Sequence, residues 1–543
     1  MEHGPAGKVH AARQMVSGAK GKRRERLRHA SRSIAAAGSR TELAMRRHPR
    51  YYLSSHQPLV GVLGRGQNMK TGWILAVLAL LASGLSASAT SSEIDAFIEA
   101  ELSQSAAPGI AYAQVTNGEI TAGGFGERVE GSGESVTADT LFPIGSVTKS
   151  FTALAIMQLV EAEVLDLDDP VSQHLPAFAG GPASDVTLRQ LLNHTSGFST
   201  VQGNSHHGNT DASRLGLVEY AGQLARIEPA HEAGTVWEYS NANYQILGAV
   251  IERASGESYS DYIEGHIFEP LGMTDSVVVV GAKPVDMAIG HRPWFGGVRP
   301  FESGLGYAIN APAGGIAASA RDMGRYLAMW LSDEGGIVSA SSKAVMTGAS
   351  GPASPSYGLG WSIDGQRGTV SHTGLVPGAE TLASFDPAKQ IGVVVMVNAN
   401  GGLGFANTSH LVGGVGARAM GQPYEDGGAL WGPKTAYLSI VILPPLFVLF
   451  AIVSWRGRSS LRAKRESMPG KLSLWFPLAA MLGLAWFLIS LLPTIFGGSI
   501  ATLQLYQPDF AWCLIATAIL APAWAVFRLV LAYAGHEKRK STA

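Results

Sequence analysis

The chain has 543 residues and a formal net charge of −1, and its length allows roughly two to four domains. The charge is uneven: residues 1–68 hold 14 Lys or Arg against 3 Glu, which leaves 27 basic and 39 acidic residues elsewhere. This acidic remainder gives no support for nucleic-acid binding, and we expect no nucleic-acid partner. Cys513 is the single cysteine, so an intrachain disulfide is excluded and cysteine usage does not indicate the compartment.

The first 89 residues divide into two segments. Residues 1–68 are rich in Arg and lack an apolar period, so we expect them to be disordered or the product of a misassigned start; a basic cytoplasmic arm is the alternative. Met69 begins a second pattern: a basic residue, an apolar run over 73–81 and the small residues Ala87-Ser88-Ala89. This pattern predicts a signal peptide over residues 69–89 and an exported domain that begins near Thr90.

Residues 90–425 have the pattern of one mixed α/β domain. Asn117-Gly118 between apolar runs is a strong hairpin signal. Apolar residues then follow helical spacing over 150–160, and a second hairpin is predicted from strands over 381–385 and 391–397. Strands at both ends with helices between them predict a sheet assembled from distant parts of the chain.

Three hydrophobic segments follow this domain, over residues 437–454, 472–494 and 511–533. Each approaches the ~20 residues that a helix needs to cross a bilayer, so we predict three transmembrane helices. Arg528 lies inside the third segment, near its predicted cytoplasmic end. We expect its side chain to reach the interface, although a charge within a membrane can also mark a functional site.

The basic residues around these segments predict their orientation. The loop between the first two segments carries Arg456, Arg458, Arg462, Lys464, Arg465 and Lys471, and the C-terminal tail carries Lys538, Arg539 and Lys540. The loop over 495–510 has no Lys or Arg. Because positive loops stay in the cytoplasm, the preceding domain lies outside, which the signal peptide independently requires. We therefore expect a multi-pass protein of the cytoplasmic (inner) membrane, with the lipid bilayer as a partner and the domain on the extracytoplasmic or periplasmic side.

Residues with catalytic potential begin at Gly145-Ser146-Val147-Thr148-Lys149. A serine hydroxyl is a weak nucleophile that needs a base within hydrogen-bond reach. Residues three apart share a helix face, so Lys149 can direct its amine at the Ser146 oxygen. The motif alone is weak, because Ser17 and Lys20 have the same spacing.

Two further motifs follow in the chain. The first is Tyr239-Ser240-Asn241, and the second is Ser371-His372-Thr373-Gly374. The order Ser-x-x-Lys, Tyr-x-Asn and basic-Thr-Gly resembles the class C β-lactamase and serine esterase branch of the penicillin-binding superfamily. Supporting phrases are Leu191-Leu192-Asn193-His194-Thr195-Ser196-Gly197, Gly314-Gly315-Ile316 and Tyr357-Gly358-Leu359-Gly360-Trp361, and the resemblance covers about 120 to 400.

The resemblance implies a fold and a mechanism. The fold would be an α/β (α+β) domain of the serine β-lactamase and penicillin-binding-protein type, with an antiparallel sheet flanked by helices and a helical subdomain. Ser146 would attack a carbonyl and form an acyl-enzyme, with Lys149 and Tyr239 sharing the base and acid roles. Asn241 would orient Lys149 and touch the substrate amide. The backbone N–H groups of Ser146 and Leu375 would form the oxyanion hole.

His372 departs from the pattern of the family. Members that act on β-lactams usually have Lys at this position, which helps to hold a substrate carboxylate together with Thr373 and Gly374. A mostly neutral imidazole does so less well. His-Thr-Gly resembles the triplet of esterase and D-aminopeptidase relatives, so we expect a small ester or a D-configured peptide or amide as substrate, possible cell-wall fragments included. A β-lactamase or a D-alanyl-D-alanine carboxypeptidase is the alternative.

Other candidate sites are weaker. No Gly-x-Ser-x-Gly is present, which excludes the nucleophile elbow of α/β hydrolases. His206-His207 and Asp211 lack further spaced ligands, so we expect a flexible polar loop, no metal and no cofactor. His194 is expected to be structural. The rivals from other classes are a non-catalytic binding protein with an acylatable ligand-sensing site, and a small transporter with an exported appendage.

Overall fold

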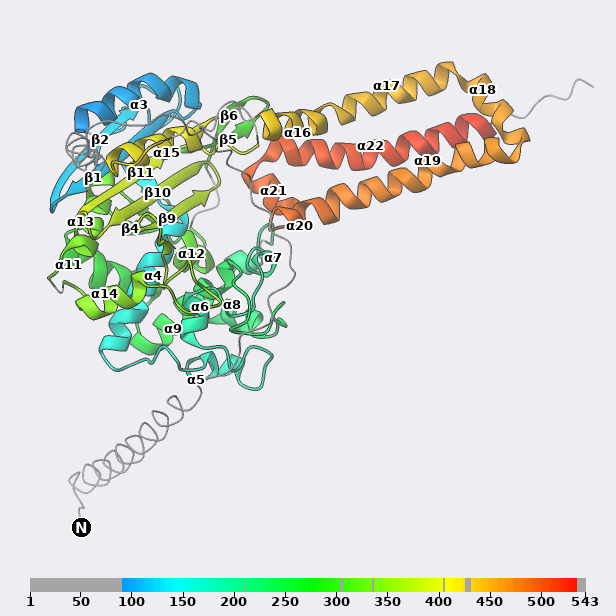
Figure 1. The fold of residues 1–543 in the computed structure, drawn as a ribbon. Coiled ribbons are helices and arrows are strands. Elements are labelled where there is room, and N and C mark those ends of the chain that lie inside the picture. Colours follow the sequence, from blue (N-terminus) through cyan, green and yellow to red (C-terminus); the bar gives the residue numbers. More distant parts are fainter. Residues whose placement is uncertain are drawn as a thin grey trace, which may run out of the picture. The chain divides into compact units, whose positions relative to one another are not determined.

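The computed structural model describes residues 90–534, apart from 210, 303–305, 335, 404–405 and 425–430. The basic segment 1–68, the predicted signal peptide 69–89 and the basic residues that follow Ala534 lie outside the described residues. The described part comprises a sheet domain, a helical subdomain and three long apolar helices (Figure 1).

A six-stranded antiparallel sheet has the order β2-β1-β11-β10-β9-β8. Its strands are β1 (Gly109–Thr116), β2 (Glu119–Gly126), β8 (Ser362–Asp364), β9 (Thr369–Val376), β10 (Ala379–Asp386) and β11 (Ile391–Val397). β1 pairs with β11 from Ile110↔Val397 to Thr116↔Ile391. Strands from the two ends of the domain are therefore neighbours, and the predicted sheet is confirmed.

Both predicted hairpins are present. Asn117 and Gly118 have φ angles of 52° and 83°, as a two-residue type I′ turn requires. In the second hairpin, the Asp386 carboxylate accepts hydrogen bonds from the backbone N–H groups of Ala388 and Lys389, at 3.0 and 3.1 Å. These local bonds close the turn between β10 and β11, so short stretches of sequence set the register of four strands.

Different helices bury the two faces of the sheet. Along β11, Val393 and Val395 pack on the side of α3 (Ser91–Ser105) and α15 (Thr408–Ala419), whereas Val394 and Met396 face the opposite core. This alternation is the period of two that a strand buried on both faces shows. Figure 1 shows α3 and α15 together on one face and α13 (Ala320–Leu331) on the other.

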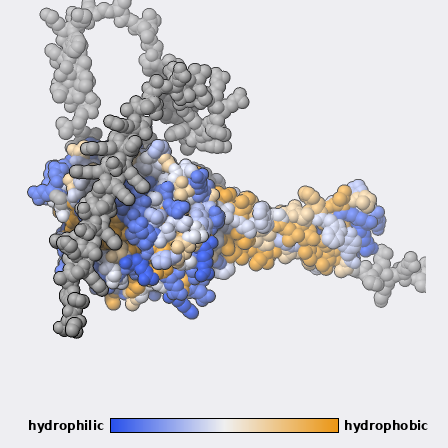
Figure 2. All heavy atoms as spheres, turned by 90° about the horizontal axis from the view of Figure 1, so that it is seen from below, coloured by the Kyte–Doolittle hydropathy of each residue, from blue (hydrophilic) through white to orange (hydrophobic). Residues whose placement is uncertain are grey.

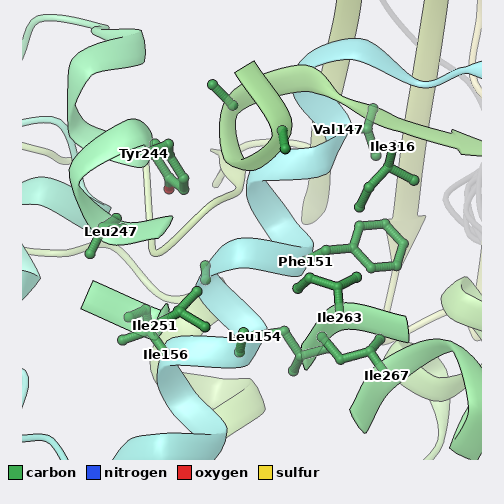
Figure 3. Close-up of a cluster of buried hydrophobic side chains, with 14 of the residues drawn as sticks. Val147, Phe151, Leu154, Ile156, Tyr244, Leu247, Ile251, Ile263, Ile267 and Ile316 are labelled. Atoms are coloured by element: carbon green, nitrogen blue, oxygen red, sulfur yellow. The ribbon is translucent and has the colours of Figure 1, made fainter. Parts of the chain in front are cut away.

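The helical subdomain is built around α4 (Thr148–Glu161) and α9 (Asn241–Ser255). Its other helices are α5 (Val171–His174), η3 (Pro176–Phe178), α6 (Leu188–Leu192), α7 (Thr200–Gly203), η4 (Ala212–Arg214), α8 (Leu217–Leu224), α10 (Tyr259–Ile263), η5 (Glu264–Phe268) and α11 (Glu269–Leu271). α4 is apolar on most sides, as expected of a helix that crosses a core. In Figure 3, Phe151 and Leu154 of α4 lie among Ile251, Ile263 and Ile267.

The remaining elements connect these two parts. They are β3 (Phe142–Pro143), η2 (Gly145–Val147), β4 (Val277–Val278), β5 (Gly290–Trp294), β6 (Gly297–Phe301), η6 (Ala308–Asn310), α12 (Ala311–Gly314), β7 (Ile316–Ala318) and α14 (Ala340–Thr347). β3, β7 and β4 form a small three-stranded sheet, and β5 pairs with β6. The β3–β7 pair leads the chain directly into the segment that carries Ser146.

Three helices are long and apolar enough to cross a membrane: Trp431–Arg456, Met468–Ile495 and Pro508–Tyr533, with mean hydropathies of 2.5, 2.1 and 2.0. They contain the three predicted segments and extend beyond them, because helical structure continues through flanking polar turns that a hydropathy pattern leaves out. Figure 2 shows a largely hydrophobic surface along these helices and hydrophilic residues at one end. The Arg528 guanidinium lies over the Trp524 ring, 5.0 Å from its centroid; its reach to the interface stays a prediction.

Phe151→Ala tests the importance of the core beneath Ser146. Phe151 is 0% exposed and stacks on Tyr326, with ring centroids 3.8 Å apart. Removing the ring leaves a cavity, so we expect a loss of about 3–5 kcal/mol in the free energy of unfolding. Chemical denaturation of the full-length protein in detergent measures it. Val164→Ala is the control, because Val164 is 48% exposed and its truncation should cost little; equal losses in the two variants would contradict the assignment of the core.

Candidate active site

Ser146 lies where the sheet meets the helical subdomain. β3 leads into η2, and α4 continues directly from it. Gly145 has a φ of +51°, and a Cβ built on it would lie 2.9 Å from the Leu375 nitrogen in β9. A residue without a Cβ is therefore needed for η2 to approach β9 this closely. The approach places Ser146 and Leu375, the two predicted oxyanion-hole residues, on adjacent segments.

Lys149 lies one turn further along, in the first turn of α4. Its side chain is 0% exposed, and its Nζ is 3.1 Å from Ser146 Oγ, so the contact expected from the spacing is present. The same nitrogen is 2.8 Å from Asn241 Oδ1 and 2.7 Å from the Ala313 carbonyl oxygen. Three segments distant in the chain therefore converge on one amine.

Burial lowers the pKa of Lys149 well below its usual value, because a buried ammonium loses its hydration. No carboxylate among the described residues offsets this effect on the Lys149 pKa. A neutral amine has two N–H donors and one lone pair. It can donate to Asn241 and Ala313 while its lone pair accepts the Ser146 hydroxyl proton. The position of the Lys149 amine and its lowered pKa are both those that a general base for Ser146 requires.

Tyr239 covers the other side of the amine. Lys149 Nζ lies 4.9 Å from the centroid of the Tyr239 ring. Burial raises the pKa of the Tyr239 phenol above its usual range, and a hydrogen bond with Ser146 only partly opposes this. The phenol therefore stays protonated. The structure brings Ser146, Lys149, Tyr239 and Asn241 together, as the resemblance led us to expect.

Asn241 begins α9 and bridges two other side chains. Its Oδ1 accepts from Lys149, and its Nδ2 donates to Asn204 Oδ1 at 2.8 Å. Asn204 follows α7, in a stretch that carries no sequence signal of function. The Ala313 carbonyl belongs to α12, next to the Gly314-Gly315-Ile316 phrase. Neither Asn204 nor Ala313 was predicted. The only sequence signal near Ala313 is the Gly314-Gly315-Ile316 motif that follows it.

His372 is buried in β9, and both of its ring nitrogens have partners. Nδ1 lies 2.7 Å from the Thr373 carbonyl oxygen, which can only accept, so Nδ1 carries the proton. Nε2 then accepts from the Tyr357 hydroxyl at 3.0 Å. Burial, and secondarily the charge of Lys149, lower the pKa of His372 to about 3. The imidazole is therefore neutral over the physiological pH range and, as placed, has no free donor for a substrate carboxylate.

Thr373 and Gly374 occupy opposite faces of the same strand. The Thr373 side chain is exposed, on the same face as Leu375. A Cβ built on Gly374 would lie 2.0 Å from the Ile144 carbonyl oxygen, which no side chain tolerates. Gly374 is therefore required for β9 to lie against the segment that carries Ser146, whereas Thr373 is free to face a substrate.

His194 stands behind the Tyr239 motif. Its Nδ1 accepts from the backbone N–H of Ser240 at 3.2 Å and from Asn243 Nδ2 at 3.1 Å, and its ring lies 4.4 Å from that of Tyr239. Burial lowers the pKa of His194 well below its usual value, so the ring is neutral. These contacts support the structural role expected for His194, as a support for Tyr239.

The loop around His206 and His207 differs from the flexible polar loop that we expected. His206 is 8% exposed, and His207 Nδ1 lies 3.2 Å from Thr502 Oγ1. Burial lowers the pKa of these residues to about 4 and about 3. Among the described residues, no group of three or more His, Cys, Asp or Glu is placed to hold a metal ion. His207 is partly buried against Thr502 and the Tyr506 ring, whereas His206 packs against His207 and Tyr220.

Comparison with known proteins identifies the family. Residues 94–417 match the family described as Beta-lactamase. The chain is 29% identical over 317 residues to protein flp of Staphylococcus aureus, covering 57% of this chain and 63% of that protein. It is 33% identical over 288 residues to the putative penicillin-binding protein PbpX of Bacillus subtilis, covering 52% and 69%. The structure of the octameric penicillin-binding protein homologue from Pyrococcus abyssi matches with a TM-score of 0.53 and 30% identity, over 61% of this chain and 77% of that one. The chain thus belongs to the β-lactamase family of serine hydrolases.

Proposed function

We propose that the protein is a membrane-anchored, extracytoplasmic serine hydrolase that forms an acyl-enzyme on Ser146. One observation carries the proposal: the buried amine of Lys149 lies 3.1 Å from Ser146 Oγ, and no carboxylate in the described part of the chain compensates its burial. A lysine held neutral in this way can act as a general base at neutral pH. This favours acyl transfer over a site that only binds a ligand.

The reaction follows from the contacts. Ser146 Oγ attacks the substrate carbonyl carbon as its proton passes to Lys149 Nζ. The tetrahedral oxyanion lies near the backbone nitrogens of Ser146 and Leu375. When the intermediate collapses, the bond to the leaving group breaks, the Tyr239 hydroxyl donates the proton that the leaving group needs, and Lys149 returns a proton to Tyr239. Water then attacks the acyl carbon as Lys149 accepts its proton; the bond from that carbon to Ser146 Oγ breaks, and Lys149 returns the proton to Oγ.

The substrate is a small ester or a D-configured peptide or amide that lacks a carboxylate next to the scissile bond. His372 supports this choice, because both of its nitrogens are engaged and its ring is neutral. Trp237 and Leu375 are 43% and 49% exposed beside the Tyr239 and His372 motifs, which favours an apolar group on the substrate. A β-lactamase or carboxypeptidase would instead need a cation at this position.

The membrane topology is also a proposal. Basic residues are concentrated on α18 (Arg458–Ala463) and η7 (Lys464–Glu466), which join the first two long helices. Arg462 contacts the carbonyl oxygens of Leu531 and Ala534, at the end of the third helix. The opposite end of the helices contacts the catalytic domain and has no basic residue over 495–507. This asymmetry supports a cytoplasmic basic end and an extracytoplasmic domain.

Ser146→Ala should abolish covalent labelling by a fluorophosphonate probe, because the Ser146 hydroxyl lies beside the buried amine of Lys149. Intact mass spectrometry of the full-length protein in detergent measures the adduct. Ser150→Ala is the matched control: Ser150 lies in the same helix and donates to the Val147 carbonyl oxygen, away from Lys149. We expect one adduct on wild type and on Ser150→Ala. A folded wild-type protein that takes up no adduct excludes the hydrolase, and an adduct without turnover of any ester or amide favours the ligand-sensing alternative.

The rate of labelling should rise with pH through the Lys149 pKa and level off well below the usual lysine value of about 10.4. The sign follows from the base: only the neutral amine accepts the serine proton, and burial lowers the pKa at which it forms. His372, with a pKa of about 3, should not contribute between pH 5 and pH 9. Rates measured at fixed probe concentration over about pH 5–10 give the profile. A rate that rises only above pH 10 would show that Lys149 is not neutralised.

A matched pair of peptides tests the choice of substrate. The first ends in D-Ala-D-Ala with a free carboxylate, and the second carries the same sequence capped as its methylamide. Neutral His372 cannot pair with the carboxylate, so the site would have to take up that carboxylate without a partner. We therefore expect kcat/KM to be about tenfold higher for the capped peptide, about the free energy of one charge-assisted contact. A neutral ester assayed in parallel shows that the preparation is active. Preference for the free carboxylate would favour the carboxypeptidase alternative.

A further inference from the structure

The loop between the second and third long helices lies against the active site. It runs from α20 (Leu492–Ile495) through α21 (Ile500–Tyr506) into α22 (Pro508–Tyr533). Asn204 Nδ2 donates to the Gly497 carbonyl oxygen at 2.8 Å. The Tyr506 ring lies 6.0 Å from that of His207, and the Tyr506 phenol contributes to the raised pKa of Tyr239. Figure 1 shows α20 and α21 beside α7.

We propose that this anchor loop, residues 496–507, orients side chains of the active site. Through Gly497 and Asn204 it fixes the orientation of the Asn241 amide, and thereby that of the Lys149 amine. Asn204 is then a positioning residue that acts on Ser146 through two others. The inference rests on the acyl-enzyme function proposed above and adds a role for the membrane helices beyond tethering.

The Gly497 carbonyl oxygen can only accept a hydrogen bond. Because the Gly497 carbonyl faces Asn204, the amide nitrogen of Asn204 must point toward it, and the amide oxygen points away. That oxygen accepts from Asn241 Nδ2, so Asn241 directs its own oxygen to Lys149. Each amide has two orientations, and the carbonyl at the start of the chain selects one for both.

The orientation of Asn241 affects how Lys149 contacts Ser146. With Asn241 Oδ1 and the Ala313 carbonyl oxygen as acceptors, both N–H groups of a neutral Lys149 are occupied and its lone pair faces Ser146. If the Gly497 contact is lost, Asn204 has no preferred orientation. A flipped Asn204 favours a flipped Asn241, which offers N–H groups to Lys149 and competes with Ser146 for the lone pair.

The packing around the hydrogen bonds is close enough to hold them. A Cβ built on Gly497 would lie 2.8 Å from Thr200 Cγ2 and 3.7 Å from Thr200 Cβ. Thr200 Oγ1 in turn donates to the Tyr239 carbonyl oxygen at 2.6 Å. The anchor loop therefore touches α7 at a residue that also supports the Tyr239 motif, so two routes join the loop to the site.

The first test is Asn204→Ala, measured as the rate of fluorophosphonate labelling of the full-length protein in lipid nanodiscs. We expect about a tenfold lower rate, which is the loss of the two hydrogen bonds that orient Asn241. Asn209→Ala is the control: Asn209 also takes part in two hydrogen bonds in the same loop, to the backbone N–H groups of Asp211 and Ala212, and its label rate should stay within about twofold of wild type. Equal rates for the two variants overturn the inference.

A pH profile separates positioning from damage to the fold. Loss of the Asn241 oxygen next to Lys149 removes an acceptor that favours the ammonium, so Asn204→Ala should move the acidic limb of the profile to lower pH. A merely destabilised protein would lose labelled fraction at every pH and keep the limb in place. An unmoved limb in Asn204→Ala therefore also counts against the inference.

A disulfide tests the contact without relying on activity. The distance of 3.7 Å between the built Gly497 Cβ and Thr200 Cβ lies within the range of about 3.5–4.5 Å for disulfides. In a Cys513→Ser background, we expect Thr200→Cys/Gly497→Cys to close under mild oxidation, detected by mass, and Thr200→Cys/Gly432→Cys to stay reduced. Because Gly497 has a φ of +73°, circular dichroism first verifies that the pair variant is folded, and an open pair in that folded protein overturns the inference. Failure of wild type to label, with the first pair closed, would instead reject the proposed hydrolase.

Discussion

The structure depends on one unfavourable arrangement, the burial of the Lys149 amine with no anion beside it among the residues that the structure describes. Transferring a charged ammonium into a protein interior is costly, and burial therefore lowers the pKa of the Lys149 amine. Lys149 can stay buried because Asn241 and the Ala313 carbonyl take its N–H groups. Those partners belong to α9 and α12, so the fold must bring both helices to the first turn of α4. The packing of the helical subdomain is thus tied to the ionisation of one side chain.

Glycine at two positions makes the second half of the site possible. The segment around Ser146 and strand β9 approach so closely that a Cβ on Gly145 or Gly374 would collide with the backbone of the other segment. Backbone N–H groups can stabilise a developing oxyanion only when they are fixed before the reaction begins. The absence of side chains at these two contacts provides that rigidity. The neutral His372, held by Tyr357, lies on the buried face of the same strand, opposite Thr373.

Short sequence patterns predicted those features that depend on residues close together in the chain. Asn117-Gly118 specified a hairpin, and the three-residue step from Ser146 to Lys149 specified a contact on one helix face. The convergence of Tyr239 and Asn241 on that contact could be expected only through resemblance to a family. Asn204 and the Ala313 carbonyl could not be found at all, because a lone amide and a backbone oxygen leave no pattern in the chain. The contact of His207 with Thr502 could not be predicted for the same reason, since the two residues lie far apart in the chain.

The anchor loop also bears on why the protein has three long helices where one would tether it. A loop that must present the Gly497 carbonyl to Asn204 needs both of its ends held, and two antiparallel helices hold them at little further entropic cost. Any such contact is reciprocal, because a loop that favours one orientation of Asn241 is itself bound more tightly when that orientation is occupied. The proposed acylation of Ser146 would remove the hydroxyl proton that Lys149 accepts. The hydrogen-bond chain from Ser146 to Gly497 would then couple the state of Ser146 to the three long apolar helices in both directions.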